Sequence, residues 1–196
     1  MNKMIVIEQG MVGTVGKFSV GVKNIAAADG DKTATVDLSV WSDALPKEKR
    51  NDYNVKFTAG TGTVVPVGNR LYRIGRISGR NGARAGSVEI ESEAVGGLKL
   101  DDTALAVPVG GNLELHGTVV EIISVAAENG KTSASVETYS NDYPKEELAK
   151  KDAVTKIKRA AGDEITIGDR KHKIVGVHAA KDGVPGIVEI SIAPVD

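Results

Sequence analysis

Short runs in which polar and apolar residues alternate make up most of the chain, and glycine-containing turns separate them. Residues 132–140, for example, alternate small polar and apolar side chains as a half-buried strand does. Such runs predict strands at 113–125, 132–140, 154–158, 164–167, 171–178 and 186–192 in the second half, and at 18–25, 33–41, 55–59, 63–67, 71–78 and 87–91 in the first. Because the strands are short and the turns close together, antiparallel pairing is expected.

Two sequence blocks occur twice, in the same order and at the same spacing. The block GNRLYRI at 68–74 recurs as GDRKHKI at 168–174, and GSVEI at 86–90 recurs as GIVEI at 186–190. This recurrence predicts a tandem duplication of one small β-rich unit. The expected organisation is a first repeat at 1–94, a linker at 95–109 and a second repeat at 110–196.

One short helix is expected in each repeat. Residues 144–151 begin with proline, continue with acidic residues and end with lysines, which matches the polarity of a helix dipole. Residues 46–52 form its weaker counterpart. The predicted fold is therefore mainly β: two small antiparallel barrels or sandwiches, each with about six strands and one short helix. Hydrophobic periodicity does not distinguish a barrel from a sandwich.

The composition is that of an ordinary globular protein, with 41% hydrophobic and 26% charged residues among 196. Aromatic residues make up only 4%, which disfavours recognition of bases or sugars by stacking. The chain has no cysteine, which excludes disulfides and thiolate chemistry. No apolar run reaches the length of a signal peptide or a membrane span, so a cytoplasmic location is expected, with delivery by a route that needs no signal left open.

Charge is distributed unevenly, and arginine most unevenly of all. Residues 1–98 hold 13 Lys and Arg against 10 Asp and Glu, whereas residues 99–196 hold 12 against 16. Five of the eight arginines lie within fifteen residues: Arg70, Arg73, Arg76, Arg80 and Arg84. Guanidinium groups bind carboxylates and phosphates, so this ribbon is a candidate surface for an acidic protein or for nucleic acid. A solvated edge strand is the alternative. On a flat strand Arg73 and Arg76 would face opposite sides.

Other polar and aromatic residues are weaker candidates for functional residues. Trp41 and Tyr139 end equivalent strands and are either partner anchors or packing residues. The recurrent Glu89 and Glu189 are expected to make structural contacts, with Arg70 and Arg170 as candidate partners. His172 and His178 lie too far apart on one strand to share a metal, and His116 is expected to approach only one of them. Residues 60–63 read as a turn rather than as a phosphate-binding loop.

The sequence contains no recognisable nucleophile, acid–base pair, metal site or cofactor site, so an enzyme is not expected. The predicted function is non-catalytic protein binding, for instance by a cytoplasmic inhibitor or immunity-type protein that contacts an acidic partner. The predicted contact residues are Arg73, Arg76, Arg80, Arg84, Trp41 and Tyr139. One alternative is a structural protein that forms homo-oligomers through strand edges, and another is nucleic-acid binding through the Arg70–Arg84 ribbon. No membrane partner is expected.

Overall fold

The computed structural model describes residues 3–26, 33–43, 53–142 and 153–195, and these ranges form sixteen strands and no helix. The helices predicted at 46–52 and 144–151 lie outside the described residues. The expectation of a mainly β protein with antiparallel sheets is confirmed. No closed barrel is present among the described strands, so the barrel alternative is wrong.

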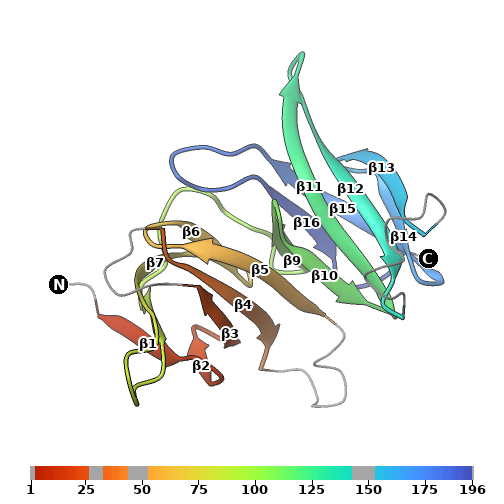
Figure 1. Cartoon of the computed structure of the whole chain (residues 1–196). Helices are drawn as coiled ribbons and strands as arrows, with labels where there is room; N and C mark the ends of the chain where they lie inside the picture. The colour runs from red at the N-terminus through yellow and green to blue at the C-terminus, as the bar shows by residue number, and fades with distance from the viewer. Residues whose placement is uncertain (1–2, 27–32, 44–52, 143–152, 196) are drawn as a thin grey trace.

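Each half of the chain contributes eight strands (Figure 1). The first half contains β1 (Met4–Glu8), β2 (Val12–Val15), β3 (Phe18–Ala26), β4 (Thr35–Ser42), β5 (Asn54–Gly60), β6 (Val64–Val67), β7 (Arg70–Ser78) and β8 (Ser87–Glu91). The second half contains β9 (Ala104–Pro108), β10 (Asn112–Leu115), β11 (Thr118–Glu128), β12 (Lys131–Ser140), β13 (Thr155–Ala160), β14 (Glu164–Ile167), β15 (Arg170–His178) and β16 (Ile187–Ser191).

The strands form one long sheet and two short ones. The long sheet has the order β13-β12-β11-β10-β5-β4-β3-β2 and runs through both halves. The short sheets, β1-β8-β7-β6 and β14-β15-β16-β9, pack against it in their respective halves. Alternation explains this packing: in β4, Val36, Leu38 and Val40 are buried, whereas Thr35 and Asp37 on the other face are only half-buried. One continuous apolar core fills the space between the sheets in both halves.

The two halves have the same strand order and nearly the same spacing. Strands β1, β2, β6 and β7 recur one hundred residues later as β9, β10, β14 and β15. Turn hydrogen bonds recur as well: the Gly62 amide donates to the Ile74 carbonyl, and the Gly162 amide donates to that of Ile174, both at 2.8 Å. A residue in these strands therefore has a structural equivalent one hundred positions away.

A joint between β5 and β10 connects the halves, and it makes the long sheet continuous. Leu113 lies opposite Val55, and Lys56 forms an ion pair with Glu114. Strand β9, which lies within the stretch predicted as a linker at 95–109, packs against β5 and β6. A second apolar cluster buries residues of both halves here: Val64, Leu71, Leu100, Ala106 and Ile187.

The structure contains three strands that the sequence pattern does not predict: β1, β2 and β9. The run predicted as one strand at 113–125 is instead two strands, because the chain turns at His116 and Gly117, which have φ angles of 51° and 69°. The left-handed conformation is uncommon outside glycine, and the strand-like pattern that continues on both sides of these two residues conceals the turn. The turns predicted at 128–130 and 60–63 are present, the latter closed by a Thr63 Oγ1 to Gly60 O bond of 2.7 Å.

Candidate functional site

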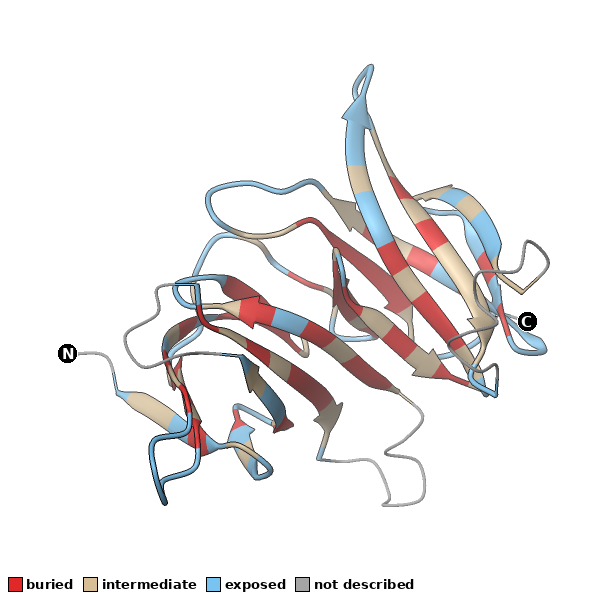
Figure 2. Cartoon of the chain, in the orientation of Figure 1, coloured by how far each residue is buried: buried red, intermediate tan, exposed pale blue. Residues whose placement is uncertain are grey.

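The side of the first half formed by β1 and β2 carries exposed apolar residues. Val6 is 61% exposed, Met11 60% and Val12 57%, the highest values among the large apolar side chains of the described residues. We call these three residues, on and between edge strands β1 and β2, the β1–β2 edge. Figure 2 shows exposed residues on β1 and β2 beside intermediate and buried ones. Large exposed apolar patches mark interaction surfaces in proteins.

The equivalent side of the second half is covered. Ala106 corresponds to Val6 and is only 6% exposed, because β9 packs against β5 and β6 of the first half. Gly111 corresponds to Met11 and is buried, and Asn112 corresponds to Val12 and pairs with Lys56. One side of the repeating unit is therefore buried by protein in the second half and open in the first.

Local contacts position the β1–β2 edge. Ile7 points into the core at 3% exposure, so its neighbour Val6 points outward. A Cβ at Gly13 would lie 2.6 Å from the Ile7 side chain, so glycine lets β1 and β2 approach closely. The Met11 amide closes the turn between them by donating to the Glu8 carbonyl at 3.0 Å. Among the described strands β2 pairs only with β3, which leaves its other edge open.

The opposite end of the molecule is polar. Its edge strand, β13, carries Lys156, Lys158 and Arg159. Next to it, Glu164 and Lys171 form an ion pair of 3.0 Å where the first half has the buried Val64 and Leu71. Cations on an edge strand discourage pairing with another strand.

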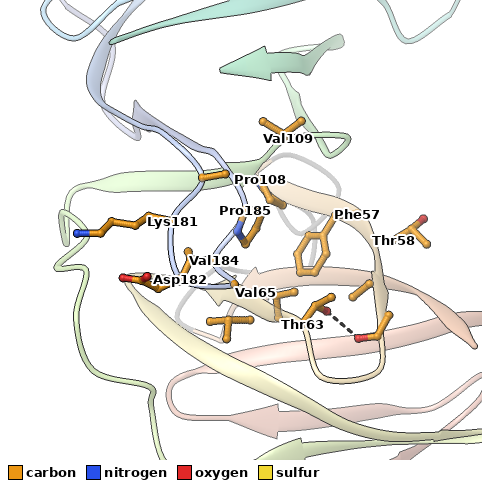
Figure 3. Close-up of a pocket in the computed structure, with 15 residues that line it drawn as sticks. Phe57, Thr58, Thr63, Val65, Pro108, Val109, Lys181, Asp182, Val184 and Pro185 are labelled. Carbon is orange, nitrogen blue, oxygen red and sulfur yellow. Dashed lines mark hydrogen bonds between the residues drawn. The ribbon is translucent and has the colours of Figure 1, made fainter. Parts of the chain in front are cut away.

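A cavity of about 490 Å³ lies at the joint (Figure 3). The loop 180–185 forms one wall, and Phe57, Val64 and Val65 of the first half line the other. In Figure 3 the side chains of Lys181 and Asp182 lie at one end of this apolar space. The lining is mostly apolar, and its charged side chains are Lys181 and Asp182.

The predicted contact arginines are all exposed. Arg73 and Arg76 form ion pairs with Glu91 and Glu89, at 3.9 and 3.6 Å. These two arginines share the outward face of β7, because a β-bulge between Ile74 and Ile77 shifts the alternation. The expectation that they face opposite sides is therefore wrong.

Arg80 and Arg84 lie on the exposed loop between β7 and β8. The equivalent loop of the second half, 180–185, covers the joint. The structure thus places Arg80 and Arg84 near the open side of the first half, where Arg80 and Gln9 line one surface hollow.

Trp41 and Tyr139 are half-buried on the long sheet. The Trp41 indole lies over Gly21, where a Cβ would be 3.3 Å from the ring. The Tyr139 hydroxyl donates to Glu121 Oε2 at 3.4 Å. Burial, followed by the nearby negative charge of Glu121, raises the pKa of Tyr139 to about 12. Neither residue lies on the β1–β2 edge.

The recurrent glutamates have different partners in the two halves. Glu89 pairs with Arg76, whereas Glu189 is 3% exposed and pairs with His178. The suggested pairing with Arg70 and Arg170 is therefore wrong. Glu189 also accepts a hydrogen bond of 2.6 Å from the Asp101 amide, which fastens the segment that leads into β9.

His116 approaches His172, whereas His178 pairs with Glu189, so the expectation that His116 would approach only one of the other two histidines is confirmed. His116 and His172 stack with ring centroids 5.4 Å apart, and Tyr53 meets His116 edge-on at 6.1 Å. His172 is fully buried and its Nδ1 donates to the Ser191 carbonyl at 2.9 Å. In the first half the corresponding positions are Tyr72 and Gly16. The second half therefore packs His172 against His116 where the first half packs Tyr72 against Gly16.

Within the described ranges, no three His, Asp or Glu side chains are grouped closely enough to hold a metal ion. That part of the chain also contains no helix with the length and apolarity needed to cross a membrane. No family model, curated protein or solved structure matches the chain.

Proposed function

We propose that the chain is a non-catalytic protein-binding module that arose by tandem duplication, and that the β1–β2 edge is its contact surface. One observation carries this proposal. The side of the unit that is covered by protein in the second half, at Ala106 and Gly111, is open in the first half at Val6 and Met11. Open strand edges bind partners by adding a strand to the sheet, and exposed apolar side chains add contact area.

The recurrence of two sequence blocks and of the strand order supports the duplication. After such a duplication both units carry the same potential contact side. In the second unit the first unit occupies it, and in the first unit it is available to another molecule. An inhibitor or a structural assembly protein would use the surface in the same physical way.

A photo-reactive amino acid placed at Val12 tests this proposal in the cells that produce the protein. A discrete protein adduct is expected that persists after nuclease treatment and at moderate salt. The matched control is Ile123, which is 42% exposed and lies on β11 in the other half, where no adduct is expected. Equal labelling from both positions, or none from position 12, would contradict the proposal.

Nucleic-acid binding is the second candidate, because Arg80 and Arg84 stand on an exposed loop. The pairing of Arg73 and Arg76 with glutamates lowers the positive charge of the ribbon. If the ribbon binds nucleic acid, affinity falls steeply with salt and is lost when Arg80 and Arg84 become alanine. Contacts through the apolar β1–β2 edge would survive both changes.

A further inference from the structure

We propose that the partner of the β1–β2 edge is a second copy of this chain, bound through its own β1–β2 edge about a twofold axis. This inference depends on the proposed function, because it names the occupant of the same surface. In such a dimer the two β2 strands lie side by side, and the long sheet continues from one chain into the other.

The apolar surface of the edge is matched best by itself. Val6, Met11 and Val12 are the most exposed of the large apolar residues described, and all three lie on this one edge. A twofold contact places the β1–β2 edge against an identical edge, so exposed apolar side chains lose contact with water on both chains.

Strand direction also fits a twofold contact. Each strand of the long sheet runs antiparallel to its neighbours, including β5 and β10 at the joint. A twofold axis perpendicular to the sheet makes two copies of β2 antiparallel, which is the pairing already used throughout this sheet. The short strand β2 then gains the second neighbour that its equivalent, β10, has in β5.

The alternative is a head-to-tail contact, in which β2 of one chain pairs with β13 of the next as β10 pairs with β5 at the joint. This arrangement is sterically unfavourable. A Cβ at Gly111 would lie 3.0 Å from the Lys56 carbonyl oxygen and 3.1 Å from the Phe57 Cβ. Met11 stands at the equivalent position of the first half, and its long side chain has no room in a joint of that geometry.

Head-to-tail contact would also bring unlike surfaces together. The buried Val64 and Leu71 of the joint are replaced at the far end by the ion pair Glu164–Lys171. The far edge strand carries Lys156, Lys158 and Arg159. The apolar β1–β2 edge would then cover charged groups, at a cost in desolvation. The β13 edge carries Arg159 and the ion pairs Lys156–Glu137 and Lys158–Glu128, so it stays solvated and assembly stops at the dimer.

Sedimentation analysis over a range of concentrations tests the dimer. A single dimeric species is expected, and Met11→Lys and Val12→Lys are each expected to raise the dissociation constant by at least about tenfold, because each buries a cation in the contact. Ile123→Lys, an equally drastic change at an exposed site on β11, leaves the dimer intact. Circular dichroism confirms that each variant is folded. A chain that is monomeric at about 100 μM, or a species that keeps growing with concentration, overturns the inference.

Single cysteines distinguish the two geometries, since the chain has none of its own. Near a twofold axis a residue meets its own copy, so Val12→Cys or Thr14→Cys alone forms a covalent dimer under mild oxidation, and Ile123→Cys does not. A head-to-tail contact instead places Val12 opposite Lys156, as Asn112 lies opposite Lys56. Covalent ladders formed only by the double variant Val12→Cys/Lys156→Cys would overturn the twofold arrangement. A monomeric chain whose position 12 labels a different protein would overturn the self-contact and leave the proposed function standing.

Discussion

At the scale of single residues, the outer face of the long sheet controls the chemistry of Tyr139. Its hydroxyl is half-buried beside Glu121, and both effects favour the neutral phenol. An unfolded tyrosine ionises near pH 10, whereas the pKa of Tyr139 in the folded chain is about 12. The folded state therefore holds the proton longer than the unfolded state. The stability that depends on this proton is complete below pH 10 and is lost as the pH rises through 12.

This difference predicts the alkaline titration of the protein. The phenolate absorbance that Tyr139→Phe removes from the titration curve should have its midpoint near pH 12. Glu121→Gln should move that midpoint toward pH 10, because it removes the neighbouring negative charge. A midpoint at 10 in the unmodified chain would show that the hydroxyl is fully hydrated.

At the scale of elements, alternation and turn residues predicted most strands, including β8 and β14 with their observed bounds. Strands β1 and β2 do not show this pattern clearly, because their outward positions hold Val6 and Val12 beside the polar Glu8 and Thr14, so the alternation is interrupted. The same residues form the candidate site. A strand edge that binds a partner loses the pattern by which solvated strands are recognised.

Register defects were also beyond the pattern. The bulge between Ile74 and Ile77 places Arg73 and Arg76 on one face; its sequence signal is the isolated glycine Gly75, which hydrophobic alternation alone does not detect. The arginine ribbon was found from its density in the sequence. Its ion pairs with Glu89 and Glu91 became visible only from the register of β7 against β8.

The edge pairing at the joint makes a prediction about Gly111. Because an added Cβ would lie 3.0 Å from two carbonyl oxygens, those of Lys56 and Pro108, Gly111→Ala should lower the free energy of unfolding by about 1–3 kcal/mol. Gly96→Ala is the matched control, since no atom lies within 4 Å of its added Cβ. Chemical denaturation measures both. Equal stability of the two variants would mean that β5 and β10 are spaced more widely than the structure shows.

At the scale of the whole molecule, comparison of the two halves identifies the open edge as a potential contact surface. Its equivalence to the covered side of the second half depends on which strands meet at the joint, and a repeat in the sequence does not specify that pairing. Val6 is exposed, whereas its equivalent in the second half, Ala106, is buried at the joint, and this difference identifies the open side. The joint also makes the halves interdependent, because they share the long sheet, the main core and a second apolar cluster.

This interdependence predicts that the halves unfold together. Trp41 is the only tryptophan and lies in the first half, so its fluorescence reports on that half, whereas circular dichroism reports on all strands. Ile165 is fully buried in the second half, and Ile165→Ala should cost about 2–5 kcal/mol. Because the core is continuous, the thermal midpoint seen by Trp41 should fall by the same several degrees as the midpoint seen by circular dichroism. A Trp41 transition that stays in place while the dichroism signal splits would show that the first half folds independently, with the joint contributing little to its stability.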